Sequence, residues 1–257
     1  MKPQNATKTE SPLNDIKMNA FTSKWAKQRG IPVQYLEQIK STHEYAKQKI
    51  FNELTENDPF HLTLTDQQTH GRGRGTNTWS VEQDGSCLLS TWSYFVPETP
   101  HPTFPIRVGL GLFKAAMSTW PFLEWSIKAP NDLLLEGNKI AGLLNETVTQ
   151  GNQFAVFISL GMNVWSAPEK VQDAVSLVEC LPEDCPLLAD DWISFLDHLS
   201  FELTECILKS NESLTFCERQ SVIHSLNLNP AIENPYTKLD PFGNLETKSE
   251  TISWLKL

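Results

Sequence analysis

The positions of apolar and polar residues along the chain predict more strands than helices. Residues 61–65 alternate between apolar and polar side chains, which is typical of a half-buried strand. Residues 154–164 form a continuous apolar run with β-branched and aromatic residues, which indicates a fully buried strand. Together with segments of similar character, the predicted strands cover residues 33–39, 61–65, 87–95, 124–127 and 154–164.

Apolar residues at helical spacing predict three helices. Residues 190–208 and 106–119 each carry an amphipathic pattern, and a third helix covers about 43–54 with Ser41 or Thr42 as its N-cap. The helices lie between hairpins and do not alternate strictly with strands. The fold class is therefore α+β, with a mixed, largely antiparallel sheet and flanking helices.

The length of 257 residues allows one large domain with a small appendage. The first 18 residues are polar and predict a mobile tail. Near the other end, residues 240–244 form a turn signal between two short strand-like pieces. We predict a tail over 1–18, a main domain over 19–216 and a reduced C-terminal β appendage over 217–257.

The charge and composition exclude several classes of protein. A net charge of −10 argues against a general nucleic-acid-binding surface. The N-terminus lacks the apolar core of a signal peptide, and the longest uncharged apolar run, 154–165, is too short to span a bilayer. The five cysteines are scattered without zinc-like spacing. We expect a cytoplasmic protein that binds neither DNA nor membranes.

Two adjacent stretches carry the strongest chemical signal. Residues 128–132 read Lys-Ala-Pro-Asn-Asp, and residues 139–146 read Lys-Ile-Ala-Gly-Leu-Leu-Asn-Glu. The turn signal at 136–138 predicts a β-hairpin with Lys139 at the start of the returning strand. A lysine on a rigid strand can hold a developing negative charge, although a purely structural hairpin is an equal alternative at this point.

The loop at 67–79 contains a Gly-Arg-Gly-Arg-Gly run at 71–75. Glycines allow a backbone to approach a ligand closely, and arginines pair with carboxylate or phosphate oxygens. A solvated loop and a segment that touches RNA are the alternatives. Trp79 fits a ligand-stacking residue or a core tryptophan equally well. The Gly-Met-Asn run at 161–163 fits either a ligand contact or a bulge.

Together these motifs resemble the catalytic domain of biotin–protein ligases, also called holocarboxylase synthetases, over residues 41–164. The resemblance rests on five motifs in the family's order. They lie at 41–43, 68–74 (followed by Asn77 and Trp79), 128–132, 139–146 and 161–163.

Three residues depart from the family pattern. His43 stands where the family has Asn, Ala129 where it has Trp, and Ser159 where glycine is common. We predict no helix-turn-helix before residue 31, so the DNA-binding repressor function of some bacterial members is not expected. The family's C-terminal β-barrel looks shortened.

The resemblance implies a class II synthetase-like fold and a two-step reaction. ATP and biotin give biotinyl-5′-AMP, and a lysine of a carboxylase biotin carrier domain then takes the biotin. Lys139 and Arg74 are the implied catalytic residues. The implied biotin-binding residues are Ser41, Thr42, His43, Gln68, Gly71, Arg72, Gly73, Arg74, Lys139 and Gly142. The implied adenylate- and ATP-binding residues are Arg72, Arg74, Asn77, Trp79, Lys128, Asn131, Asp132 and Lys139.

The resemblance also implies Mg²⁺ held through Asn131 or Asp132, and a monomer or weak homodimer. Two alternatives are open. One is a lipoate or octanoate ligase of the same fold, although the Arg-Arg-x-x-Gly-Gly-Gly loop of those enzymes is absent from this sequence. The other is a non-catalytic biotin-binding relative, which His43, Ala129 and Ser159 would support.

Overall fold

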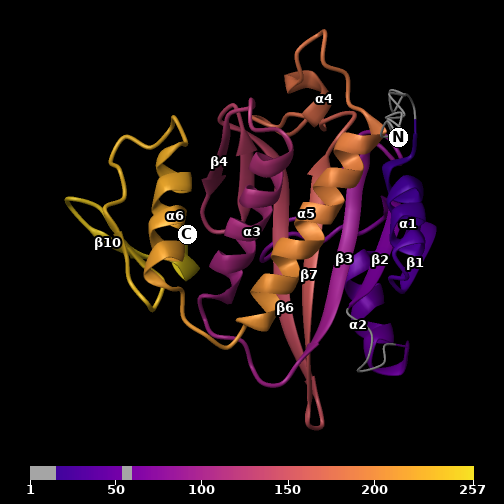
Figure 1. Cartoon of the computed structure of the whole chain (residues 1–257), viewed down its shortest axis with the longest axis horizontal. Coiled ribbons are helices and arrows are strands. Elements are labelled where there is room, and N and C mark those ends of the chain that lie inside the picture. Colours follow the sequence, from indigo (N-terminus) through magenta and orange to yellow (C-terminus); the bar gives the residue numbers. More distant parts are fainter. Residues whose placement is uncertain (1–15, 54–59) are drawn as a thin grey trace, which may run out of the picture.

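A seven-stranded sheet forms the centre of the structure, a computed structural model that describes residues 16–53 and 60–257 (Figure 1). Its strand order is β1-β2-β3-β7-β6-β5-β4. Only β1 and β2 pair in parallel, so the predicted mixed, largely antiparallel sheet is confirmed. The strands are β1 Val33–Ile39, β2 His61–Gln68, β3 Cys87–Val96, β4 Trp125–Lys128, β5 Asp132–Leu135, β6 Asn138–Gln150 and β7 Gln153–Asn163.

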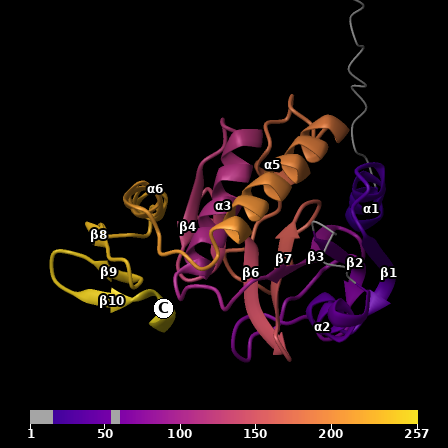
Figure 2. The same ribbon diagram turned by 60° about the horizontal axis from the view of Figure 1, so that its bottom comes forward.

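Helices cover the two faces of this sheet unequally. The larger core contains Trp25, Trp92 and Phe195, which come from α1, β3 and α5. Figure 2 shows α2 on the opposite side of the sheet from α3 and α5. The helices are α1 Met18–Gln28, α2 Thr42–Glu53, α3 Phe104–Thr119, α4 Leu177–Cys180, α5 Ala189–Leu208 and α6 Phe216–Asn227. Each of them is too short or too polar to cross a membrane.

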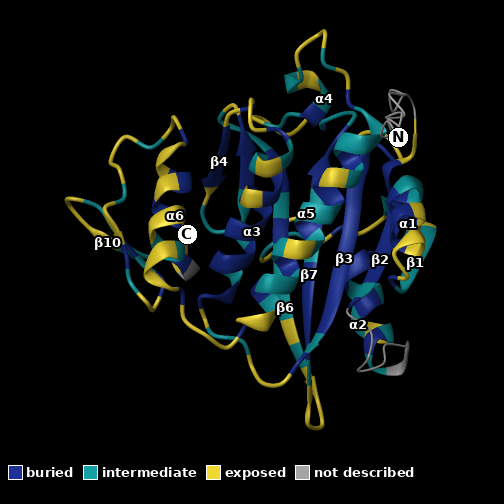
Figure 3. Ribbon diagram, viewed as in Figure 1, coloured by how far each residue is buried: buried dark blue, intermediate teal, exposed yellow. Residues whose placement is uncertain are grey.

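The α2 side of the sheet carries a second, smaller core. Ala46 and Ile50 of α2 pack against Ala155 and Phe157 of β7, and Figure 3 shows the central strands dark with burial. Successive side chains of a strand point to opposite faces, so Ser159 and Gly161 continue the face that carries Phe157. Because α2 covers only the Phe157 end, the rest of this face is left for a pocket.

The C-terminal segment contains more than the predicted β appendage. It begins with α6, which no pattern predicted at 217–227, and the three-stranded sheet of β8 Lys238–Leu239, β9 Asn244–Glu246 and β10 Thr251–Ser253 follows. The predicted turn at 240–244 connects β8 and β9. Thr215 and Glu218 form a reciprocal capping box at the start of α6, a local signal that would have predicted this helix.

The predicted helix and strand positions agree with the structure within a few residues at each end. Besides α6, the helices α1 and α4 were missed. The predicted tail at 1–18 is wrong at its end, because Met18 is fully buried and starts α1; residues 1–15 lie outside the described residues. Leu54, the predicted end of the helix at 43–54, also lies outside them.

Candidate functional site

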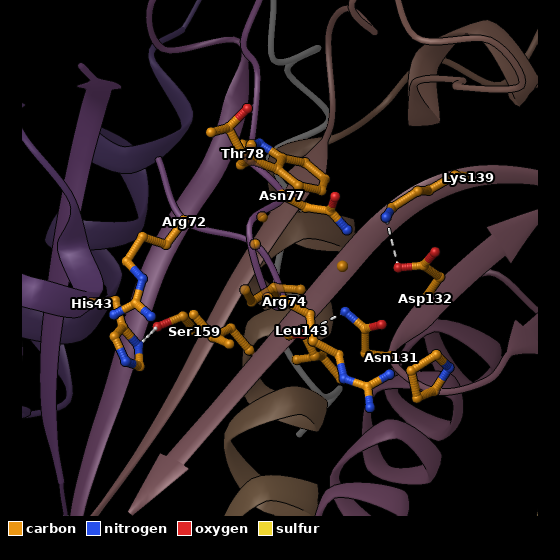
Figure 4. Close-up of a pocket in the computed structure, with 18 of the residues that line it drawn as sticks. His43, Arg72, Arg74, Asn77, Thr78, Asn131, Asp132, Lys139, Leu143 and Ser159 are labelled. Atoms are coloured by element: carbon orange, nitrogen blue, oxygen red, sulfur yellow. Dashed lines mark hydrogen bonds and ion pairs between the residues drawn. The ribbon is translucent and has the colours of Figure 1, made fainter. Parts of the chain in front are cut away.

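A pocket of about 560 Å³ opens on the α2 side of the sheet (Figure 4). It gathers all but one of the predicted site residues, which come from α2, β2, the 69–84 loop and the β4–β5–β6 hairpins. Gly71 is the exception and lines an adjacent pocket of about 580 Å³ beneath the same loop. The predicted residues in the wall are Ser41, Thr42, His43, Gln68, Arg72, Gly73, Arg74, Asn77, Trp79, Lys128, Asn131, Asp132, Lys139 and Gly142.

Apart from Arg72, the charged side chains of the wall gather at one end of this pocket. Figure 4 shows His43 and Ser159 on one side and Asn131, Asp132 and Lys139 on the other. We call the first group, with Ser41, Thr42 and Gln68, the neutral end. We call the second group, with Arg74 and Lys128, the charged end.

The predicted hairpin at the charged end is confirmed. Glu136 and Gly137 have φ values of 52° and 78°, and a two-residue turn with two positive φ angles is the type I′ turn that joins twisted strands closely. Lys139 is the second residue of the returning strand β6. Its Nζ lies 2.7 Å from Asp132 Oδ1, and the two side chains form an ion pair.

A β-bulge turns Lys139 toward the pocket. Leu133 pairs with Ala141, but its neighbour Leu134 pairs with Lys139, so Ile140 is an extra residue in β6. Without the bulge, Lys139 and Gly142 would point to opposite faces, since they are three residues apart. With it they lie side by side: Lys139 Cε is 3.5 Å from where a Cβ of Gly142 would be.

Backbone contacts hold Lys139 on this bulge. Its N–H donates to Asp173 O at 2.6 Å, and its carbonyl accepts from Val175 N at 3.0 Å. The position of Lys139 is therefore not fixed by the β5–β6 strand register alone. The segment around Ala174, far along the chain, contributes to it.

The turn at 129–132 is anchored on both sides. Asn131 Nδ2 donates to Leu143 O at 2.8 Å, and Leu143 N donates to Asn131 O at 2.9 Å. From the C-terminal segment, the buried Trp254 donates its Nε1–H to Pro130 O at 3.0 Å. Because Nδ2 is occupied, Asn131 offers its carbonyl oxygen Oδ1 as a hard ligand atom.

Two glycines make a flat floor between the two ends. Gly142 of β6 and Gly161 of β7 are register partners, and the indole of Trp79 lies on them. A Cβ on Gly161 would approach Trp79 Cε2 to 2.5 Å, closer than atoms pack in proteins, so only glycine fits here. Lys139 Nζ lies 5.8 Å from the Trp79 ring centroid. Trp79 is thus a pocket wall and not a core tryptophan.

The Gly-Arg loop folds back on itself and places Trp79. Gly73 N donates to Asn77 O at 2.8 Å and Trp79 N donates to Gly71 O at 3.1 Å. These bonds form a small irregular hairpin across the pocket. The Trp79 Nε1–H is buried and has no partner among the described residues.

At the neutral end, Ser41 and Thr42 do different things. Thr42 N and Oγ1 lie 2.8 and 3.2 Å from Gln68 Oε1, which orients the Gln68 amide. Ser41 is 2% exposed, yet its Oγ has no partner in the described part of the chain. A buried hydroxyl without a partner is costly, and a ligand that bonds to it removes that cost. Ser41 therefore suits ligand binding rather than helix capping.

His43 lies in a hydrogen-bond network. Its Nδ1 is 2.8 Å from Ser159 Oγ and its Nε2 is 2.7 Å from Glu146 Oε2. Burial lowers the pKa of His43 below its usual value, although the Glu146 carboxylate acts in the opposite direction. Burial alone would raise the pKa of Glu146, but hydrogen bonds from Lys47 and His43 outweigh burial and lower it.

The two loop arginines have separate surroundings. Arg72 donates to Glu44 of α2, and its Nη1 lies 3.9 Å from Glu146 Oε2. Figure 4 shows Arg72 beside His43, whereas Arg74 lies near Leu143. Only Arg74 therefore lies toward the charged end.

The sequence did not single out several other wall residues. Ser90 and Leu257 line the pocket, and Thr91 lies behind Ser159 with their oxygens 2.7 Å apart. Alternation within 87–95 gives a weak signal for Thr91, because it places every second side chain on one face. No local pattern points to Trp254 or Leu257.

The charges of the site suit an anionic ligand and not a stable all-protein metal site. Among residues 16–53 and 60–257, no three His, Cys, Asp or Glu side chains are grouped to hold a metal ion. The charged end can bind phosphates or a carboxylate, and the neutral end can bind an uncharged polar ring.

Comparisons with known proteins agree with this geometry. The model of the biotin/lipoate A/B protein ligase family matches residues 35–163, just over half of the chain. A biotin–[acetyl-CoA-carboxylase] ligase of Mycobacterium tuberculosis is 33% identical over 123 residues, which make up 46% of this chain and 45% of that protein. The chain spans less than half the length of the curated relatives it matches.

Solved structures share the fold. A biotin protein ligase from Aquifex aeolicus in complex with biotin and ATP aligns with a TM-score of 0.63 and 20% identity, over 85% of this chain and 92% of that one. A biotin protein ligase from Leishmania major in complex with biotinyl-5-AMP aligns with a TM-score of 0.54 and 19% identity, over 84% and 93%. The predicted catalytic-domain fold is confirmed.

Proposed function

We propose that this chain, which belongs to the biotin/lipoate A/B protein ligase family, is an ATP-dependent biotin–protein ligase. It forms biotinyl-5′-AMP from biotin and ATP with release of pyrophosphate. It then transfers biotin to a lysine of a carboxylase biotin carrier domain. The observation that carries this proposal is a single pocket in which an uncharged hydrogen-bonding end meets a cationic end.

The barrier to the first step is electrostatic, because a carboxylate must approach a polyanion. Cationic groups fixed before the reaction lower this barrier without reorganising. Lys139, held by the bulge and by the backbone of 173–175, is the group best placed to contact both anions. Arg74 and Lys128 contribute further positive charge from the loop and from β4.

The neutral end suits the ring of biotin, a urea fused to an apolar ring. A urea needs both donors and acceptors, and Ser41, Thr42, Gln68 and Ser159 supply them. The glycine floor with Trp79 suits the apolar valeryl chain, since it offers a flat surface without side chains. We assign Gly71, Gly73 and Asn77 to the loop that covers the ligand and keeps water from the anhydride.

Mg²⁺ would enter with ATP. Asp132 Oδ1 is buried and forms an ion pair with Lys139, but the described residues give it no hydrogen bond. With Asn131 Oδ1 it offers hard oxygen atoms, and Mg²⁺ commonly binds one or two protein oxygens together with phosphates and water. The ion would neutralise phosphate charge during the reaction.

We propose that residues 19–216 are the catalytic domain and that the C-terminal segment supports it. Trp254, which bonds to Pro130, and Leu257, in the pocket wall, support this role. Because α6 starts at Phe216, the segment begins with this helix. The cytoplasmic location, the monomeric or weakly dimeric state and the lack of DNA binding stay predictions.

The test is a pyrophosphate-release assay with MgATP and either biotin, lipoate or octanoate. We expect release with biotin alone, and transfer of labelled biotin to a biotin carrier domain. Release with lipoate or octanoate in place of biotin would assign the chain to the sister ligases. Tight biotin binding without pyrophosphate release would make it a non-catalytic binding protein.

A further inference from the structure

Two of the three departures from the family pattern contact each other. His43 and Ser159 are 116 positions apart in the sequence, yet His43 Nδ1 lies 2.8 Å from Ser159 Oγ. Ser159 also contacts Thr91, with 2.7 Å between their oxygens. Thr91 and Ser159 are register partners on β3 and β7. Helix α2 therefore places His43 next to a pair of hydroxyls on the neighbouring strands β7 and β3. Figure 4 shows the contact between His43 and Ser159. We call His43, Ser159 and Thr91 the row.

The partners of this row fix the direction of every hydrogen bond in it. Glu146 is a carboxylate at neutral pH and accepts only, so His43 Nε2 carries the proton of a neutral ring. His43 Nδ1 is then an acceptor, and Ser159 donates its only proton to it. Because that proton is used, Thr91 donates to Ser159.

This direction leaves Ser159 with one free lone pair. A hydroxyl oxygen accepts two hydrogen bonds, and among the described residues only Thr91 donates one to Ser159. Ser159 is partly exposed and lines the pocket, whereas Thr91 is fully buried. We propose that Ser159 is a specificity-determining acceptor for a ring N–H of the ligand, and that His43 is the positioning residue that fixes this polarity.

This inference rests on the proposed function, because the urea of biotin is the N–H donor it requires. A protonated His43 would occupy this lone pair of Ser159. His43 Nδ1 would donate to Ser159 Oγ, and Thr91, whose proton has no other acceptor among the described residues, would still donate there. Both lone pairs would then be used, and the Ser159 proton would face the ligand N–H. The charged groups around His43 are Glu146 on β6, Lys47 and Glu44 on α2, and Arg72 on the loop.

The experiment measures biotin affinity of the full chain by calorimetry without ATP. We expect Ser159→Ala to weaken biotin about 3- to 10-fold, the value of one neutral hydrogen bond. Ser159→Ala should weaken the binding of desthiobiotin by the same factor, because desthiobiotin keeps the urea and lacks only the sulfur ring. Ser93→Ala is the matched control. It removes a buried hydroxyl on the neighbouring strand β3, on the same face but outside the pocket, and should leave affinity unchanged.

The role of His43 is tested by pH. The wild-type dissociation constant should rise as pH falls through the range in which NMR shows His43 to titrate, while His43→Asn should show no such rise. Equal biotin affinity of Ser159→Ala and wild type overturns the acceptor role. Superposed pH curves of wild type and His43→Asn overturn the positioning role. A wild type that fails to bind biotin at pH 7.5 overturns the proposed function itself.

Discussion

The neutral and charged ends of the pocket are built from different kinds of contact. At the neutral end, uncharged groups are buried and orient one another across α2, β3 and β7, as His43, Ser159 and Thr91 do. At the charged end, Lys139 is about one-third exposed and forms an ion pair with Asp132. The neutral end is thus set before a ligand arrives, which favours selectivity. The charged end keeps its cations available for charge that appears during reaction.

The largest expected effect comes from a substitution at the charged end alone. Lys139→Ala should lower the rate of biotin adenylation by about 10²- to 10³-fold, the usual cost of removing one fixed group that stabilises transition-state charge. Biotin affinity should fall by much less, because the neutral end is intact. Pyrophosphate release and calorimetry measure the two quantities.

Lys24→Ala is the control for that variant. Lys24 is exposed on α1, so its loss changes the net charge equally without touching the pocket. If Lys139→Ala lost binding and rate by the same factor, the two ends would not act separately.

The second prediction concerns the floor that joins the two ends. A Cβ on Gly161 would lie 2.5 Å from Trp79, against 3.2 Å for Gly142. Gly161→Ala must therefore displace the indole, and overpacking typically costs about 1–3 kcal/mol. We expect biotin affinity to fall roughly tenfold or more with Gly161→Ala and less with Gly142→Ala.

Gly109→Ala serves as the matched glycine control. A Cβ on Gly109 of α3 meets nothing within 4 Å, and alanine is the better helix former by about 0.5–1 kcal/mol. This variant should bind biotin normally and unfold at a slightly higher temperature. Normal biotin affinity in Gly161→Ala would show that Trp79 is not a fixed part of the floor.

At the charged end, the sequence could predict the features that depend on local contacts but not those that depend on distant segments. The hairpin was predictable because its turn residues, Glu136 and Gly137, act locally. The bulge at Ile140 was not, because it depends on hydrogen bonds from Lys139 to the distant segment 173–175. Sequence motifs therefore located Lys139 but not its orientation.

The neutral end shows a similar limit. His43 and Ser159 were each recognised as departures, but the packing of α2 on β7 decides that they touch. The same holds for Trp254, whose bond to Pro130 joins residues 124 positions apart. By contrast α6 was missed despite a local signal, the capping box of Thr215 and Glu218.

A third prediction sharpens the neutral end. Ser41→Ala should weaken biotin binding about 3- to 10-fold, because the Ser41 hydroxyl is buried, has no partner among the described residues, and would be satisfied by a ligand bond. For the same reason the free protein should be equally stable or more stable, since the variant removes an unsatisfied polar atom. Calorimetry measures the loss of biotin affinity, and thermal unfolding measures the unchanged or increased stability. A large loss of stability would show that Ser41 is structural.

The smallest expected effect is on the pH dependence of stability, and it tests His43 at the neutral end. The pKa of His43 is lowered in the folded protein, while an unfolded histidine titrates near pH 6.5. Below that pH the unfolded chain binds more protons, so stability is full above about pH 6.5 and falls toward the folded pKa. The slope for one proton cannot exceed about 1.4 kcal/mol per pH unit.

Urea unfolding between pH 7.5 and 5 should therefore show a smaller loss of unfolding free energy for His43→Asn than for wild type. Glu146, whose pKa is lowered from 4.5, acts with the same sign only in a more acidic range, so parallel losses in the two proteins above pH 5 would contradict a buried neutral His43.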